Sequence, residues 1–389
     1  MVDVVARLRW FFALLPVFPP LSLASFYFLR YWRVLNKTTR GVLVFYIFSQ
    51  VLAAIFTPEP VLSLILGMAR ALFIVALVIM GASLRDKSAL YYLLIGISVV
   101  LLMALATTYA AFGPHFYSRR LIHPYYTEAA LGIAGALGVW ILLDWQGSWR
   151  LRLPLLLLAL GGLMFAGSRG AIGAMLVGLL AAVPLKNLRY LWALLVAAVF
   201  LVFRYGLLWL GGWTPELHRM FSLQLSGRDK IWKHAWKAVV THPWGGVGPY
   251  QLGPWLDYRN GNFALWEGAS ALGFHFPAWA KKLDGAWLIA HDIFLHSLGE
   301  SGVIGTLGFL ALLGLIGYAV IRARDPLLAA IFFGYLVMGL VDNPIAVPSL
   351  FFAEVFWVAG GMALAQAGLA VPLEQSLAVD DDQLGPDPL

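Results

Sequence analysis

Cysteine is absent from this chain of 389 residues. Without a thiol, the protein has no disulfide, no thiolate-bound metal and no cysteine nucleophile. Charged residues are also scarce, at 12% of the chain, whereas a soluble globular domain has about 25%. The remainder is dominated by hydrophobic residues, which make up 61% of the sequence. This balance excludes an ordinary soluble protein and indicates a chain that crosses a membrane many times.

Several motifs that mark common active sites are missing as well. The sequence contains no Walker A motif, no Rossmann glycine motif and no His-Glu-x-x-His motif. It also has no Cys/His cluster with the spacing of metal ligands. We therefore expect neither a metal nor an organic cofactor. The net charge is +7, but the basic residues stand in short loops between apolar runs and not in one stripe. This pattern predicts no nucleic-acid partner.

Long apolar runs predict an all-α polytopic membrane protein, a bundle of about 11–12 transmembrane helices. The first run contains Pro16, Pro19 and Pro20, so it forms either one kinked helix or two short helical pieces. It is too long for the apolar part of a signal peptide and lacks a clear cleavage site, so we interpret it as a retained span. The expected spans are 10–29, 41–57, 61–81, 89–110, 126–143, 151–166, 170–185, 189–210, 292–321, 327–342 and 349–370.

Lysine and arginine residues follow every second span, so these loops fall on one side of the membrane, which we assign to the cytoplasm. The chain then divides into N-terminal transmembrane helices (1–210), a large periplasmic loop (211–290), C-terminal transmembrane helices (291–370) and a short acidic cytoplasmic tail (371–389). In a bacterium this organisation predicts a multi-pass protein of the inner membrane, with its partly helical large loop in the periplasm.

A second set of basic residues lies on the opposite, outer side. Arg119 and Arg120 stand in the loop between the fourth and fifth spans. Arg169 follows Gly167 and Ser168 in a tight turn between two spans. A rigid guanidinium fork at the outer membrane surface suits a pair of phosphate oxygens, which favours an anion-binding role for Arg169.

Two arginines, Arg70 and Arg204, fall inside the apolar runs, and Glu300 lies in the helix expected after His291. A guanidinium at membrane depth is costly and usually faces a wet cavity or an anionic partner. The sequence leaves open whether the two arginines have a function or pair structurally. We interpret Glu300 as a helix anchor or as the partner of an arginine.

The large loop is the one long polar interruption of the chain. Its stretch 222–242 has the pattern of an amphipathic helix, with Arg228 in the first turn. A cation there reinforces an anion site at a helix N-terminus; the alternative is a helix that lies on the bilayer with its tryptophans among the headgroups. Trp232 belongs to this helix, and Trp287 to the aromatic stretch 255–287. That stretch either stacks on sugar faces or packs as a cap over the bundle.

His291 stands where the large loop meets the next span, a position neither fully solvated nor in lipid. An imidazole titrates near neutral pH, which suits a general base that acts on an alcohol in a cavity. A structural hydrogen bond is the alternative. His296 follows five residues later on a different face of the helix, and we prefer His291 as the base.

Together these segments resemble the O-antigen ligase and O-antigen polymerase superfamily over about residues 160–310, in motif order and spacing. The family usually has asparagine after the histidine, and this chain has Asp292 instead, which leaves open a part for that carboxylate in proton transfer. The motifs are Ser168-Arg169-Gly170, Gly227-Arg228 with Trp232, the glycine turn Pro243 to Gly248, and His291 with Glu300-Ser301-Gly302-Val303-Ile304-Gly305.

The resemblance implies a metal-independent membrane glycosyltransferase that needs no nucleotide. Its donor would be a glycan on undecaprenyl pyrophosphate, and its acceptor a sugar hydroxyl of lipid A–core. Arg169 and Arg228 would hold the pyrophosphate and stabilise the leaving group, while His291 would take the proton of the acceptor hydroxyl. Further candidates for substrate binding are Arg119, Arg120, Asp292, Trp232 and Trp287.

Three other functions compete with this one. An O-antigen polymerase uses the same chemistry but takes a second lipid-linked repeat unit as acceptor. A protein-glycosylating transferase of the same superfamily usually carries more chain after the last spans than is present here. From a different class, a transporter of lipid-linked glycans usually shows repeat symmetry and broken central helices, and we find no convincing repeat.

Overall fold

The computed structural model describes residues 2–185, 228–256, 289–347 and 352–371, and this part of the chain is all-helical. Within it, β-pairing is confined to an isolated bridge between Leu35 and Ala370. The helices are α1 (Val2–Leu14), η1 (Pro19–Val34), α2 (Lys37–Ile55), α3 (Pro60–Leu84), η2 (Lys87–Tyr92), α4 (Leu93–Phe112), η3 (Gly113–Ser118), α5 (Glu128–Asp144), α6 (Trp149–Ala166), α7 (Arg169–Ala182), η4 (Val183–Leu185), α10 (Arg228–Thr241), α11 (Leu252–Trp255), α14 (Ile293–Ala323), α15 (Pro326–Gly339) and α16 (Ala353–Gln366).

The membrane architecture predicted from the sequence is confirmed. Each predicted span from 41–57 onward that falls on described residues coincides with a helix. In this part of the chain, 5 helical stretches are long and apolar enough to cross a membrane, and α7 and α15 are shorter apolar helices. The predicted span 189–210, most of the large loop and the acidic tail lie outside the described residues. The long stretches are Lys37–Ile55, Pro60–Leu84, Lys87–Phe116, Trp149–Ala166 and Ile293–Ala323.

The first predicted span, 10–29, divides at its prolines. Helix α1 ends at Leu14, and the 3₁₀ helix η1 begins at Pro19. Proline lacks an amide hydrogen and clashes with the preceding turn, so it ends one helix, yet its fixed φ suits the first turn of the next. Of the two alternatives, the structure therefore adopts two short helical pieces.

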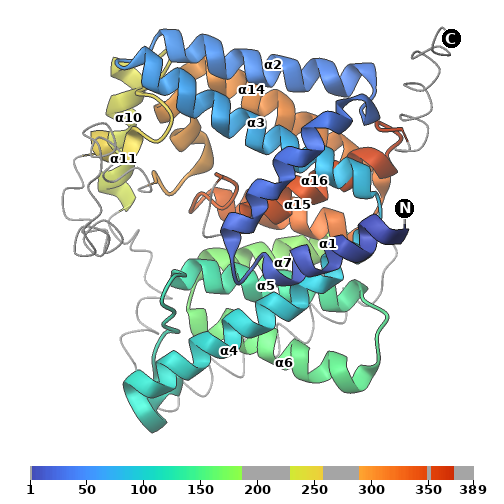
Figure 1. Ribbon diagram of the computed structural model, residues 1–389. Helices are drawn as coiled ribbons and strands as arrows, with labels where there is room; N and C mark the ends of the chain where they lie inside the picture. The colour runs from blue at the N-terminus through green and yellow to red at the C-terminus, as the bar shows by residue number, and fades with distance from the viewer. Residues whose placement is uncertain (1, 186–227, 257–288, 348–351, 372–389) are drawn as a thin grey trace, which may run out of the picture.

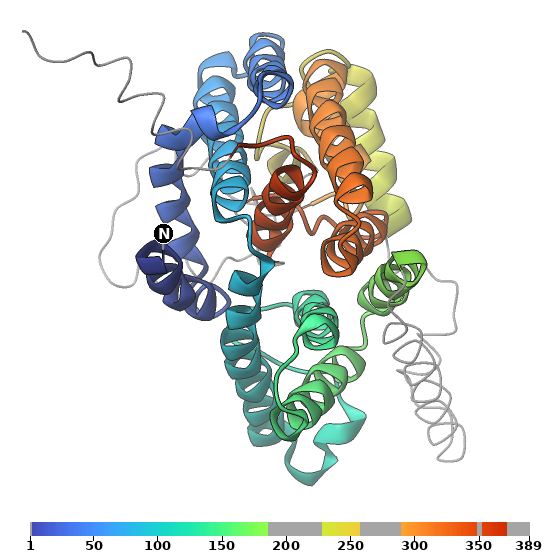
Figure 2. The same cartoon turned by 90° about the vertical axis from the view of Figure 1, so that its right-hand side faces the viewer.

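The helices form two groups that meet along α15 (Figures 1 and 2). Helices α2, α3, α14 and α16 pack together in one group, and α4, α5, α6 and α7 in the other; α15 packs against both α7 and α16. Close helix approach in lipid needs small residues. At the crossing of α3 and α16, a Cβ on Gly81 would lie 1.9 Å from Val358 O, and one on Gly361 would lie 2.0 Å from Val78 O.

Lys87 forms ion pairs with two carboxylates at one end of the bundle. Its ammonium group lies 2.8 Å from Asp144 Oδ1 and 2.7 Å from Asp325 Oδ2. These residues come from the loops after the third, fifth and ninth predicted spans. They therefore meet at one end of the bundle, as the alternation of basic loops predicts. Helices α10 and α11 lie at the opposite end of α2, α3 and α14 (Figure 1).

Candidate functional site

His291 pairs with a carboxylate at the end of the bundle where α10 lies. Its Nδ1 is 3.2 Å from Oδ1 of Asp342, in the segment that follows α15. A neutral ring donates to a carboxylate only through a protonated Nδ1, and the lone pair then falls on Nε2. Asp342 is buried, and its Oδ1 also accepts from the backbone N–H of Asn343 at 3.0 Å. The pair therefore fixes the orientation of the imidazole and, in a neutral ring, leaves the lone pair on Nε2; a role as general base stays a prediction.

Asp292 and the backbone of His291 shape the start of α14. His291 has φ 52, in the left-handed region that residues other than glycine rarely adopt. Asp292 is the N-cap, and its Oδ1 accepts from Leu295 N at 2.7 Å. This contact satisfies one of the helix's first amide groups. The structure thus gives Asp292 a capping role, and a role in substrate binding stays a prediction.

Arg169 is the exposed first residue of α7. Gly167, with φ 61, ends α6 in the left-handed conformation. Ser168 is the N-cap of α7, and its hydroxyl accepts from Ala171 N at 3.3 Å. Gly170, the next residue, lies against the end of α15 and the segment after it: a Cβ there would be 2.9 Å from Met338 Sδ and 2.6 Å from Val341 Cγ2. Val341 directly precedes the partner of His291. The fold thus brings the Arg169 turn beside the residue that orients the imidazole.

Arg120 braces the turn that presents Arg169. Its Nε donates to Ala166 O at 3.2 Å, and its Nη2 donates to Gly167 O at 3.4 Å. Its Nη1 lies 3.3 Å from Glu128 Oε1. These contacts give Arg120 a structural role at the turn. The Arg119 guanidinium lies 5.3 Å from the centre of the Phe112 ring and is exposed. Substrate binding by either residue stays a prediction.

Helix α10 carries Arg228 at its first position and packs toward the start of α14. Ile231, Ala235 and Ala238 form a small apolar cluster with Ala290 and Leu295. Residues three apart are neighbours on a helix surface, so Arg228 continues this stripe by one turn. It is partly buried.

Of the two candidate tryptophans, only one falls on described residues. Trp232 is partly buried on α10, and its Nε1 has no hydrogen-bond partner among the residues that the structure describes. Trp287 lies outside them. Substrate binding by both tryptophans stays a prediction.

The glycine turn that follows α10 docks into a break in α14. Gly302 has φ 57 and interrupts the helix, which leaves backbone groups on both sides of it without helical partners. Within a membrane protein such groups need other partners, and the turn supplies them. The bonds run from Val247 N to Gly299 O (2.8 Å), Gly248 N to Glu300 O (2.9 Å), Val303 N to Pro243 O (2.8 Å) and Ile304 N to Trp244 O (3.2 Å).

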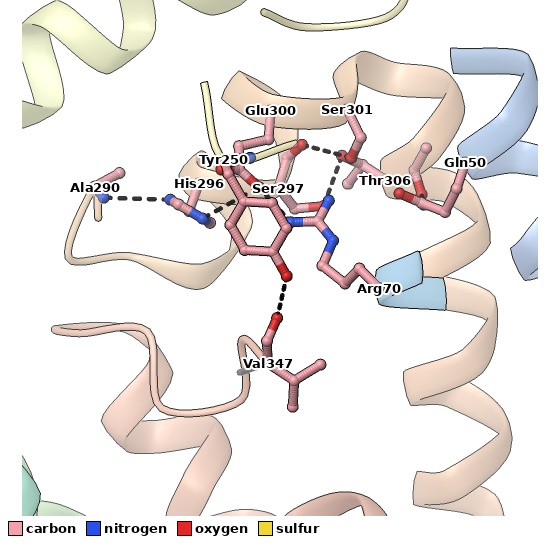
Figure 3. Close-up of polar contacts among 11 residues, drawn as sticks. Gln50, Arg70, Tyr250, Ala290, His296, Ser297, Glu300, Ser301, Thr306 and Val347 are labelled. Carbon is pink, nitrogen blue, oxygen red and sulfur yellow. Dashed lines mark hydrogen bonds and ion pairs between the residues drawn. The ribbon is translucent and has the colours of Figure 1, made fainter. Parts of the chain in front are cut away.

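A buried polar cluster lies behind this junction (Figure 3). Arg70 of α3 forms an ion pair with Oε2 of Glu300, and this oxygen is 3.4 Å from Nε2 of His296. The other oxygen of Glu300 accepts from Tyr250 N at 2.7 Å. Burial raises the pKa of the Tyr250 phenol, which therefore stays protonated at neutral pH and donates to Val347 O. The structural pairing expected for Glu300 is confirmed.

Arg70, Glu300 and His296 line a cavity of about 40 Å³ together with Asn343. Sequence reasoning identified Arg70 as a costly charge in an apolar run and allowed an arginine partner for Glu300, but it did not name Arg70 as that partner. Opposite charges in two spans are a signal for such a pair. Among the described residues, no three His, Asp or Glu side chains lie close enough together to bind a metal ion.

Comparison with known families agrees with the motifs found in the sequence. Residues 154–310 match the family model of O-antigen ligases. The match runs from α6 into the middle of α14, and so includes Arg169, Arg228, His291 and the turn that docks at Gly302. It confirms the resemblance to the O-antigen ligase superfamily and supports a ligase-like or polymerase-like function. Comparison with curated proteins gave no match.

Proposed function

We propose that this chain is an O-antigen ligase-like glycosyltransferase that moves a glycan from undecaprenyl pyrophosphate to an acceptor sugar hydroxyl of lipid A–core. The observation that carries this proposal is the pairing of His291 with buried Asp342, next to the turn that presents Arg169. A base fixed by a carboxylate suits the deprotonation of an alcohol, and an exposed guanidinium at the N-terminus of a helix that packs next to that carboxylate's segment suits the binding of a phosphate.

The transfer is a single displacement at the anomeric carbon. The acceptor oxygen forms the new bond to that carbon, and its proton passes to Nε2 of His291. The bond from the carbon to the pyrophosphate oxygen breaks, and the electron pair leaves with undecaprenyl pyrophosphate. One displacement inverts the configuration. Asp342 stabilises the positive charge that the ring acquires.

Arg169 and Arg228 act on the leaving group. Negative charge grows on the pyrophosphate as the glycosidic bond breaks, and guanidinium groups already in position lower the energy of that state. Arg169 sits at the N-terminus of α7, where the helix dipole also favours an anion. Arg228 has the corresponding position on α10. The chemistry takes place on the periplasmic side of the inner membrane, where the lipid-linked donor is presented.

Purified protein in liposomes, supplied with a lipid-pyrophosphate glycan and separate acceptors, tests the proposal. We expect transfer to lipid A–core, lost in His291→Ala and retained in His234→Ala, which removes an exposed histidine of α10. Laddered lipid-linked chains would indicate a polymerase instead, and glycosylated protein a protein transferase. Movement of the glycan across the bilayer without bond cleavage would reject the enzyme, as would full transfer by His291→Ala.

A further inference from the structure

We propose that His296, oriented by Glu300 and Arg70, is a positioning residue for His291. The inference rests on the proposed role of His291 as the base. His296 is buried in α14, and its described polar contacts are with Ala290 N and Glu300, not with the His291 ring. Its contact is with the backbone immediately before His291 (Figure 3).

The two nitrogens of His296 have different partners. Nδ1 accepts from the backbone N–H of Ala290 at 3.4 Å. Nε2 lies 3.4 Å from Oε2 of Glu300. Since Nδ1 accepts, the ring hydrogen is on Nε2 and points to the carboxylate. The His296 side chain is 8% exposed, so both of its polar atoms depend on these partners. His296 therefore links Glu300 to the backbone of Ala290, and its ring nitrogens are not free to act as a base.

Glu300 sets this arrangement and is itself held on three sides. Its Oε2 receives Arg70 and His296, and its Oε1 accepts from Tyr250 N at 2.7 Å. A carboxylate fixed in this way stays an acceptor and selects the tautomer of His296 with hydrogen on Nε2. That tautomer is the one whose Nδ1 can receive the Ala290 amide.

The Ala290 amide connects the buried polar cluster to His291, because Ala290 directly precedes the proposed base in the chain. His291 has φ 52, which a residue with a side chain keeps only when its surroundings fix it. The side chain is fixed by Asp342, and the following residue by the N-cap of α14. The bond to His296 fixes the preceding residue. Without it, the peptide between residues 289 and 290, whose N–H it holds, is free to relax, and the chain that leads into His291 can turn the imidazole away from Asp342.

Replacements of His296 that differ only in the position of their acceptor test this role. Asparagine places an oxygen near the position of Nδ1, and glutamine places its amide near Nε2. Leucine fills similar space without an acceptor. We expect His296→Leu to lower kcat for glycan transfer by about 10- to 100-fold, since a base misplaced by about 1 Å loses that much. KM should stay near the wild-type value, because no contact with the donor is removed.

His296→Asn should restore most of kcat, and His296→Gln should not. Gln50→Leu is the matched control: it removes another buried contact in the same cavity, the one to Gly305 O, and should leave kcat unchanged. Should His296→Leu fail to accumulate, the contrast between asparagine and glutamine decides the matter. Equal activity of the asparagine and glutamine variants would overturn the proposal.

Hydrogen exchange at the Ala290 amide gives a readout that does not need activity. We expect exchange to speed up in His296→Leu and to return toward wild type in His296→Asn. Slow exchange in His296→Leu would overturn the inference. Failure of the proposed function looks different: His291→Ala would then keep full transfer, whatever the exchange rate at Ala290.

Discussion

The imidazole of His291 and the carboxylate of Asp342 meet at 3.2 Å, although the two residues are 51 positions apart in the chain. Asp342 has 4% of its side chain exposed, and His291 has 33%. The carboxylate is also fixed by the Asn343 amide, so it cannot follow a moving ring. The buried partner therefore determines where the ring points, and in the proposed mechanism Nε2 is the nitrogen that takes the proton of the acceptor.

Asp342→Asn should lower kcat while the protein remains folded. The amide oxygen can still accept from Nδ1, but the negative charge that stabilises a protonated ring is lost. We expect a smaller fall than the about 10²–10⁴-fold that a general base contributes. Steady-state transfer from a lipid-pyrophosphate glycan checks this, with exposed Asp229→Asn as the control. Wild-type kcat in Asp342→Asn would contradict the role given to the pair.

Arg169→Lys should impair transfer even though the charge is kept. An ammonium group cannot form the two parallel hydrogen bonds that a guanidinium makes to a phosphate. Removal of one donor from a charge-stabilising site typically costs about 10²–10³-fold in kcat, and we expect a loss near the lower end. The control is Arg322→Lys on the last turn of α14, where Nη1 donates only to the Tyr318 hydroxyl among the contacts seen. Equal rates for both variants would remove Arg169 from the pyrophosphate site.

The helices and the Arg169 turn were predictable because local rules determine them. An apolar run in lipid must satisfy its own backbone groups, and a helix does so with residues of the run alone. Ser168 after Gly167 is a local signal for a helix start, and α7 begins at Arg169, one residue before the predicted span 170–185. The prolines of the first span likewise left two options, and one of them is observed.

The partners in the two long-range pairs of the site could not be named from the sequence, because they are far apart in the chain. Arg70 and Glu300 are 230 positions apart, and their contact depends on how α3 and α14 pack. Each alone is only a charge in an apolar run. His296 was set aside because it faces away from His291, yet that orientation lets it reach Ala290 and Glu300. Asp342 gave no signal, since one acid after an apolar run is common.

Gly302→Ala should destabilise the protein, because the turn after α10 fills the space beside it. A Cβ there would lie 2.2 Å from Trp244 O, and φ 57 is unfavourable for alanine. We expect a loss of about 1–3 kcal/mol in the free energy of unfolding. Gly314 lies on the same helix with nothing within 4 Å of a built Cβ. Gly314→Ala should therefore be neutral or stabilising by up to about 1 kcal/mol. Thermal unfolding in detergent compares them, and equal midpoints would contradict the docking.

His123 makes the loop beside Arg120 sensitive to pH. Its Nδ1 accepts from Tyr125 N at 3.1 Å and from Tyr126 N at 3.2 Å, which requires an unprotonated nitrogen. Burial lowers the pKa of His123 below its ordinary value of 6.5. The folded loop therefore binds fewer protons than the unfolded chain. The stability that this neutral His123 contributes to the loop is fully present above pH 6.5 and is lost as pH falls through the lowered pKa.

We expect the Tyr125 and Tyr126 amides to lose protection from hydrogen exchange as pH falls below 6.5, after correction for the intrinsic rate. His123→Asn is the matched variant, because its side-chain oxygen occupies the acceptor position and does not titrate in this range. Protection in that variant should not depend on pH. Because Arg120 in the same loop donates to Gly167 O beside Arg169, the opened loop should also lower transfer at acid pH. An equal pH dependence in wild type and His123→Asn would exclude His123 as the cause.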